Sequence, residues 1–360
     1  MNLADFYYDL PKELIGQSAI EPRDSCKLMV LDRQTQQISH HVFKDLLDIL
    51  DTDTVLVLND TKVFPARLFG AKESGGKIEV LLLKQLELDK YLTLTRGSIK
   101  PDQKIIFSQH FHATVIEKLS DGEVKLQFNL SGPDLLAQTD QLGKTPLPPY
   151  IQSTASEDKL REQYQTVYAK EKGSAAAPTA GLHFTEDLLN RLKEKGIQIE
   201  KITLHVGLGT FKPVTDEQIK NKVLHSEHFE ITKETADRLN TAKQAGKKII
   251  AVGTTSCRVL ESQTDSNGVL KPSRGETNIF IQPGYKFKFL NGLLTNFHFP
   301  ETSLLMLVSA LVCFPNSPAS PAGRPTHFKN FSESPIGKAY KEAIDKKYKF
   351  FSFGDAMLIL

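Results

Sequence analysis

The spacing of apolar residues changes along the chain and predicts three regions of different structure. Near the start, residues 43–50 carry apolar side chains at helical spacing, whereas residues 55–58 are entirely apolar, as in a buried strand. That run ends at Asn59-Asp60-Thr61, residue types that favour turns. The first region therefore predicts a helix followed by a central strand.

The second region, residues 63–150, alternates apolar and polar residues in short runs, which is the pattern of antiparallel strands. Ser74-Gly75-Gly76 and Asp121-Gly122 are turn sequences of the kind that close hairpins. The predicted strands are 77–86, 91–96, 104–107, 111–118 and 123–130. Because no helical pattern separates them, they predict a small barrel or sandwich.

In the third region, from residue 150 onward, helical and strand patterns alternate. Thr185 and Thr232 are predicted N-caps of two helices, each of which ends at a glycine. The apolar runs 197–204 and 248–252 then predict strands. This alternation favours an α/β architecture with largely parallel strands.

The second region is expected to be an insertion, because the apolar central strand precedes it and the α/β pattern follows it. Its exit, Pro146-Leu-Pro-Pro149, is typical of a stiff linker. We expect a large α/β domain formed by residues 1–64 and 150–360, with a small antiparallel β-barrel domain, residues 65–149, inserted into it. Residues 315–335, which are rich in proline, predict a surface excursion.

Composition restricts the class of protein. Of 360 residues, 40% are hydrophobic and 24% are charged, as in globular proteins. The longest apolar run, 304–314, is about half of the ~20 residues that a membrane span needs. The first residues lack the basic and apolar parts of a secretory signal, and three widely spaced cysteines do not indicate disulfides. We therefore expect a cytoplasmic protein with no membrane partner.

The formal net charge is only +2, far from the positive field of a dedicated nucleic-acid binder. A nucleic-acid substrate would therefore need a local basic patch. The lysine-rich segment 338–349 is one candidate, and a solvated helix face is the alternative interpretation.

Four segments combine glycine, threonine and histidine after a predicted strand or loop. Small residues let the backbone approach a ligand, and a helix N-terminus attracts an anion. Their candidate ligand-contacting residues are Thr179, Gly181 and His183, then His205, Gly207, Gly209 and Thr210, then Gly253, Thr254, Thr255 and Arg258, and finally His298 and Glu301. For each segment, a packed turn without a ligand is the alternative.

Several common sites are not indicated. His225 and His228 stand three residues apart without a His-Glu-x-x-His pattern, so we expect no metal. The sequence contains no phosphate-binding loop of the Gly-x-x-x-x-Gly-Lys type. Ser256 lacks the Gly-x-Ser-x-Gly surroundings of a hydrolase nucleophile.

A family resemblance covers nearly the whole chain. The stretches that carry it are Asn59–Gly70, Gly75–Glu79, Pro146–Ile151, Tyr164–Ala169, 173–185, Thr203–Phe211, Gly253–Ser262, Gly284-Tyr285, Thr295–Pro300 and Tyr348–Met357. In this order they resemble the S-adenosylmethionine:tRNA ribosyltransferase-isomerases of queuosine biosynthesis. Each stretch alone is modest, but the set is specific. The resemblance implies a large α/β domain with an inserted β-barrel.

The resemblance also implies a reaction with S-adenosylmethionine as co-substrate and a tRNA anticodon stem-loop as partner. The ribosyl group would move to the aminomethyl group of 7-aminomethyl-7-deazaguanine at the wobble position, giving epoxyqueuosine. The sulfonium would acidify the ribose 5′ hydrogens, so that a base removes one. Adenine would then depart, the amine would attack the anomeric carbon, and ring rearrangement would expel methionine.

This implied chemistry suggests catalytic roles. A base near neutral pKa favours histidine, and His183 is the first choice, with His205 and His298 as alternatives. An acid should assist the departure of adenine, for which Asp60 or Glu301 is suitable if buried and protonated.

The same chemistry suggests binding roles. The methionine carboxylate needs a cation or a helix N-terminus, which Arg258 and the turn 253–256 could supply. Arg67, at the entrance to the predicted barrel, could contact either the co-substrate or a tRNA phosphate.

Three positions depart from the family pattern. Members carry Arg-Asp-x-Ser-Arg-Leu near the start, where this chain has Arg23-Asp-Ser-Cys26-Lys27-Leu. Lys27 keeps the charge but loses the bidentate geometry of arginine. Asn278 replaces a commonly acidic residue, so we expect no catalytic role there.

Two other functions compete with this interpretation. A different S-adenosylmethionine or nucleotide enzyme, such as a methyltransferase, would leave S-adenosylhomocysteine rather than adenine. A non-catalytic RNA-binding protein would consume no S-adenosylmethionine. We expect a monomer, with a homodimer as the alternative.

Overall fold

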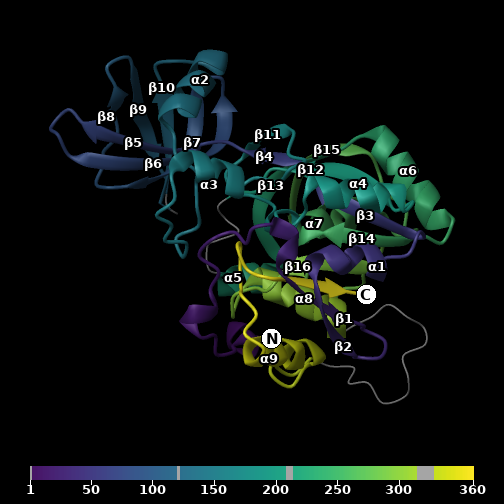
Figure 1. Cartoon of the computed structure of the whole chain (residues 1–360). Helices are drawn as coiled ribbons and strands as arrows, with labels where there is room; N and C mark the ends of the chain where they lie inside the picture. Colours follow the sequence, from purple (N-terminus) through teal and green to yellow (C-terminus); the bar gives the residue numbers. More distant parts are fainter. Residues whose placement is uncertain (1, 120–121, 208–213, 314–327) are drawn as a thin grey trace.

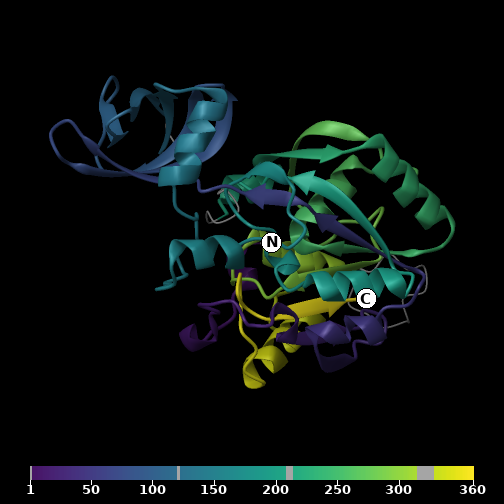
Figure 2. The ribbon, with the colours of Figure 1, turned by 45° about the horizontal axis from the view of Figure 1, so that its top comes forward.

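The computed structural model describes residues 2–119, 122–207, 214–313 and 328–360 (Figure 1). The chain forms a closed β-barrel that stands to one side of a larger body of helices and one broad sheet (Figures 1 and 2). This architecture confirms the predicted α/β fold with an inserted antiparallel barrel.

The barrel closes in the strand order β10-β7-β6-β5-β8-β9, with antiparallel neighbours throughout. Its strands are β5 (Arg67–Lys72), β6 (Lys77–Glu87), β7 (Lys90–Arg96), β8 (Lys104–Ser108), β9 (Phe111–Lys118) and β10 (Glu123–Phe128). Alternate side chains point inward, so that Val80 and Leu82 of β6 meet Ala113 and Val115 of β9 in one apolar core. A helix that the sequence pattern did not predict, α2 (Gly132–Leu142), follows the last strand.

The broad sheet has the order β15-β13-β12-β3-β14-β16-β17-β1-β2. Its strands are β1 (Lys27–Leu31), β2 (Ile38–Val42), β3 (Thr54–Asn59), β12 (Gln198–Leu204), β13 (Val223–Ile231), β14 (Lys248–Val252), β15 (Ser273–Ile279), β16 (Gly292–Asn296) and β17 (Ala356–Ile359). The central neighbours of β3 and β14 are parallel, but β16–β17, β1–β2, β12–β13 and β13–β15 pair antiparallel. The prediction of largely parallel strands was therefore wrong for these four pairs, whereas β1 and β17 pair in parallel.

Helices cover both faces of this sheet, which explains why β3 is apolar on both sides. Val55 and Val57 face one core with α6 (Lys233–Gln244), α7 (Gly253–Gln263), α8 (Ser303–Cys313) and α9 (Pro335–Asp345). Leu56 and Leu58 face a second core with α1 (Leu46–Ile49) and α4 (Glu186–Glu194). Among the described residues, the remaining helices are α3 (Glu157–Gln163), α5 (Asp216–Asn221) and five 3-10 turns, at Leu3–Phe6, Lys12–Leu14, Arg23–Ser25, Phe43–Asp45 and Thr179–Gly181.

Local signals predicted the helix ends well. The side chains of Thr185 and Thr232 accept hydrogen bonds from the backbone of Leu188 and Thr235, as N-caps do. A small parallel sheet of β4 (Thr61–Val63) and β11 (Glu171–Ser174) lies between the broad sheet and the barrel. Much of the predicted excursion 315–335 lies outside the described residues.

Candidate active site

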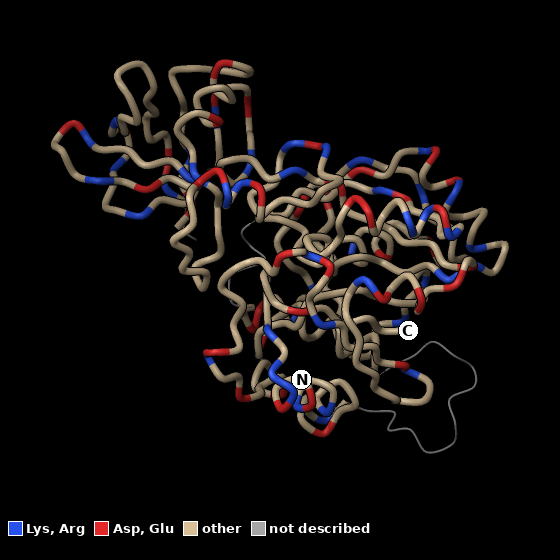
Figure 3. Tube along the Cα trace, in the orientation of Figure 1, with Lys and Arg blue, Asp and Glu red and all other residues tan. Residues whose placement is uncertain are grey.

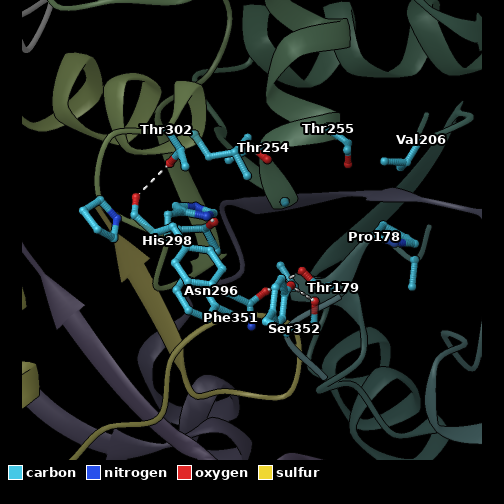
Figure 4. A pocket seen from close by; sticks show the side chains of 18 of the residues that line it. Pro178, Thr179, Val206, Thr254, Thr255, Asn296, His298, Thr302, Phe351 and Ser352 are labelled. Carbon is cyan, nitrogen blue, oxygen red and sulfur yellow. Dashed lines mark hydrogen bonds between the residues drawn. The ribbon is translucent and has the colours of Figure 1, made fainter. Parts of the chain in front are cut away.

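A pocket of about 400 Å³ opens where β14 and β16 end, at the carboxyl edge of the parallel strands. Five segments line it, and Figure 4 shows their side chains turned toward a common space. The segments lie within residues 149–150, 177–180, 253–255, 295–304 and 351–352, with Leu3 and Val206 at the margin. Of the predicted ligand-contacting residues, Thr179, Gly253, Thr254, Thr255, His298 and Glu301 line this pocket.

One end of the pocket is the N-terminus of α7. Gly253 has φ +86°, a left-handed conformation that lets the chain turn from β14 directly into the helix. No side chain caps this helix, so the first backbone N–H groups keep their capacity to bind an anion. The hydroxyl of Thr255 instead accepts a hydrogen bond from Asn59 Nδ2 at 3.3 Å.

Asn296, the last residue of β16, connects the pocket to His183 behind it. Asn296 Oδ1 accepts a hydrogen bond from the Thr179 hydroxyl, and Asn296 Nδ2 donates to His183 Nε2, both at 3.0 Å. Since Nε2 accepts, the proton of the neutral ring is on Nδ1, which lies 3.2 Å from Cys26 Sγ. Burial lowers the pKa of His183 to about 4. His183 is therefore neutral and reaches the pocket through Asn296.

His298 lines the pocket directly. Its Nε2 lies 2.9 Å from the Thr295 hydroxyl, while its backbone N–H donates to the Tyr340 hydroxyl at 3.1 Å. The carbonyl of His298 accepts a hydrogen bond from Tyr8. Burial lowers the pKa of His298 to about 3, so the ring is unprotonated at neutral pH.

An aromatic wall forms another side of the pocket. The ring of Tyr150 packs against Phe299 and Phe351, with centroids 5.1 and 5.2 Å apart. The Tyr150 hydroxyl and Ser352 Oγ are 2.7 Å apart, which holds the Tyr150 ring in place. This wall offers flat apolar surface to a ligand.

The charge of the pocket is unusual for a site that could bind an anion. Among the lining residues that the structure describes, Glu301 has a carboxyl group, and there is no lysine or arginine. Its backbone has φ +58°, and its N–H donates to the carbonyl of Phe6 at 3.1 Å. The wall therefore combines a carboxyl group with an anion-binding helix terminus.

Several predicted site residues lie elsewhere and make their own contacts. Asp60 is buried beyond the end of β3, where its carboxylate accepts from the Thr203 hydroxyl at 2.7 Å, and burial raises its pKa. Arg67 of β5 pairs with Glu79 of the neighbouring strand β6 and donates to the Leu147 carbonyl at 3.0 Å. These contacts tie the entrance and exit of the barrel together.

Of the predicted segment 205–211, only residues 205–207 are described, and of these Val206 lines the pocket whereas His205 and Gly207 do not. His205 Nδ1 lies 2.8 Å from the Thr61 hydroxyl, and burial lowers the pKa of His205 to about 4. The N–H of Gly207 donates to Glu227 at 3.0 Å. Gly209 and Thr210 lie outside the described residues.

Arg258 and Gly181 do not line the pocket, and each packs against other residues of the large domain. Arg258 forms a buried ion pair with Glu227 and donates to the Ile279 carbonyl at 3.3 Å. A Cβ at Gly181 would stand 1.9 Å from the Tyr168 hydroxyl, so only glycine fits there. The functional roles of these residues stay predictions.

Sequence reasoning missed Asn296, Tyr150, Phe351 and Ser352. Asn296 lies within the stretch Thr295–Pro300 but was given no role, and a polar residue ending a buried strand was the available signal. The other three come from segments far apart in the chain, which only the fold brings together. Among the described residues, no helix has the length and apolarity to cross a membrane.

Comparison with known proteins identifies the family of this chain. Residues 3–359 match the family described as queuosine biosynthesis protein. A relative from Acetivibrio thermocellus is 48% identical and one from Clostridioides difficile is 47% identical, and each alignment covers all of both chains. Both are named S-adenosylmethionine:tRNA ribosyltransferase-isomerase.

A solved structure leads to the same family. The crystal structure of an S-adenosylmethionine tRNA ribosyltransferase from Thermotoga maritima is 32% identical to this chain, with a TM-score of 0.52. The match covers 99% of this chain and 100% of that one. The chain described here belongs to the queuosine biosynthesis protein family.

Proposed function

We propose that this chain transfers and isomerises the ribosyl group of S-adenosylmethionine onto 7-aminomethyl-7-deazaguanine at the wobble position of tRNA, releasing adenine and methionine. The names of its relatives support the substrates. The observation that carries the proposal is a single pocket that joins an open helix N-terminus, an aromatic wall and a neutral histidine, with no lysine or arginine among the lining residues that the structure describes.

The absence of lysine and arginine from the described lining suits a ligand that carries its own positive charge. The sulfonium of S-adenosylmethionine would be repelled by a nearby cation in a site of low dielectric. The methionine carboxylate would bind the free N–H groups at the start of α7, beside Thr254 and Thr255, which bind an anion without a full positive charge. A volume of about 400 Å³ lies in the range of pockets for such small molecules.

The aromatic wall of Tyr150, Phe299 and Phe351 would pack against the adenine ring. Glu301, on the same segment as Phe299, would assist the departure of adenine in the protonated form of its carboxyl group, by donating a hydrogen bond to a ring nitrogen. The electron pair of the glycosidic bond leaves with adenine, so that a donor to the ring stabilises the leaving group.

His298 is the proposed base. It lines the pocket, and its buried ring carries no proton at neutral pH, although the lowered pKa makes it a weaker base than a free imidazole. His298 would take one of the 5′ protons of the ribose, whose acidity comes from the adjacent sulfonium. The hydrogen bonds that link His183, Asn296 and Thr179 would hold the ribose in position, with His183 as a positioning residue.

The proposal is tested by incubating the protein with S-adenosylmethionine and tRNA that bears 7-aminomethyl-7-deazaguanine. Free adenine and an epoxyqueuosine nucleoside should appear in equal amounts, as measured by chromatography and mass spectrometry. Formation of S-adenosylhomocysteine would instead indicate a methyltransferase. An unchanged nucleoside with intact S-adenosylmethionine would contradict the proposal and favour a non-catalytic RNA-binding protein.

A further inference from the structure

A second cavity, of about 610 Å³, lies where the barrel joins the larger domain. Residues 62–65 of the entry to the barrel, Asp140 of α2 and residues 161–167 contribute to its wall. None of its lining residues belongs to the pocket described above. Tyr164 lines this cavity and packs in one apolar cluster with Ala177, which lines the other pocket. The two cavities are therefore neighbours across one layer of side chains.

Two lysines with like charges lie side by side in the wall of the cavity. Lys62 of β4 and Lys172 of β11 are register partners in the small parallel sheet, and both line the cavity. Register partners lie side by side on one face of a sheet, where like charges destabilise the pairing. Lys172 pairs with Asp140 at 3.2 Å, whereas Lys62 has no ion pair with any residue that the structure describes. An anion bound between the two lysines would remove this repulsion.

Two arginines add to the positive charge of the cavity. Arg23 donates to the backbone carbonyls of Gln165 at 2.6 Å and Glu162 at 2.5 Å, so backbone oxygens rather than a carboxylate hold its guanidinium. Arg161 is shared between Glu157 at 3.1 Å and the carbonyl of Gly143 at 2.7 Å. Both line the cavity as cations whose guanidinium groups are fixed by these hydrogen bonds.

An apolar surface lies beside these cations. Val63, Phe64, Pro65 and Val167 line the same cavity. The side-chain amide of Gln165 clamps this surface by accepting from the Val63 N–H at 3.0 Å and donating to the Val63 carbonyl at 3.1 Å. Cations beside a rigid apolar surface match the two parts of a nucleotide, a phosphate and a base.

We propose that this cavity holds a nucleotide of the RNA substrate adjacent to the wobble position, with its phosphate between Lys62 and Lys172. The inference rests on the proposed function, which supplies tRNA as the partner and requires the wobble base to reach the co-substrate in the neighbouring pocket. Lysine, arginine, aspartate and glutamate are interspersed along the whole trace in Figure 3, with no broad basic face in that view. A local site is therefore needed to bind a polyanion.

Replacement of Lys62 by alanine tests the inference, with Lys170→Ala as the matched control. Lys170 is nearby and 75% exposed, and it pairs with Glu171 but does not line the cavity. Lys62→Ala should weaken tRNA binding about three- to tenfold and reduce the slope of log affinity against log salt by about one. Lys62→Arg should retain binding. The KM for S-adenosylmethionine should stay unchanged, and loss of a like-charge contact should not lower the Tm.

Equilibrium tRNA binding, measured by filter retention, keeps this test separate from turnover. If Lys62→Ala binds tRNA no more weakly than Lys170→Ala does, the cavity is not an RNA site and the inference is overturned. If the wild-type protein releases no adenine from S-adenosylmethionine with precursor tRNA, the proposed function fails instead. The binding comparison can be made in either case.

Discussion

The two cavities differ most in their charge. The pocket at the end of β14 and β16 has Glu301 and no described lysine or arginine, while the cavity at the barrel junction has four cationic and two acidic residues in its wall. The first would exclude a polyanion, and the second would repel a sulfonium. A protein that uses a cationic co-substrate and an RNA gains from keeping these two environments apart.

This separation explains why the near-neutral net charge of the chain does not count against an RNA substrate. A uniformly basic surface would strengthen RNA binding but would also oppose a positively charged co-substrate in a neighbouring site. Local placement of cations, as in the paired strands β4 and β11, avoids that conflict.

The largest expected effect comes from the base. His298→Ala should lower the rate of adenine release by about 10²- to 10⁴-fold, the range for loss of a general base. tRNA affinity should stay within twofold, because His298 does not line the junction cavity. Single-turnover adenine release and filter binding measure the two quantities. Unchanged turnover would remove His298 from the mechanism and return His183 to first place.

A smaller loss is expected from the residues behind the pocket. Asn296→Ala removes a buried hydrogen-bonding group worth about 1–3 kcal/mol, which corresponds to a roughly 5- to 150-fold loss in kcat/KM. His183→Ala should cost less, because it acts only through Asn296. His183→Gln, which can accept from the same amide, should restore part of the loss. If His183→Ala proves more damaging than Asn296→Ala, the positioning role is contradicted.

The smallest expected effect is that of pH on the charge of the two histidines in and behind the pocket. Burial lowers the pKa of His298 to about 3 and that of His183 to about 4. Side-chain NMR should therefore show both rings predominantly unprotonated at pH 5 and above, so the pocket gains little positive charge there. A titration midpoint near 6.5 for either ring would contradict this account.

The same shifts have a consequence for stability. The folded pKa of each histidine lies below its unfolded value of about 6.5, so the unfolded chain takes up the proton first. The unfolding free energy should thus fall as the pH drops below 6.5, by about 2 kcal/mol per histidine between pH 6.5 and 5. Urea denaturation at the two pH values measures this loss, and His183→Gln should reduce it.

Local signals in the sequence predicted the fold where neighbours in the chain decide it. The caps at Thr185 and Thr232 and the alternation in the barrel strands are of this kind. The antiparallel flanks of the broad sheet were not predictable in this way. β13 carries polar residues at exposed positions, and β17 has only four residues, so that tertiary pairing rather than pattern makes them strands.

The residues of the site likewise fall into those that local sequence signals predict and those that only the fold brings together. Thr254, Thr255 and His298 were found because each follows directly on a buried strand, where α/β proteins place ligands. The neutral state of His183 depends on burial that no local pattern reveals, and its ring lies beside Cys26, which is 157 residues away in the chain. The adjacency of Lys62 and Lys172 likewise exists only in the folded chain.

Hydrogen exchange of the backbone amides tests most directly whether one cavity binds S-adenosylmethionine and the other binds tRNA. S-adenosylmethionine alone should slow exchange in residues 177–180, 253–255 and 295–304 and leave residues 62–65 and 161–172 unchanged. Addition of tRNA should then slow exchange in residues 62–65 and 161–172. Protection of the junction segments by S-adenosylmethionine alone, or no protection at the start of α7, would contradict the account.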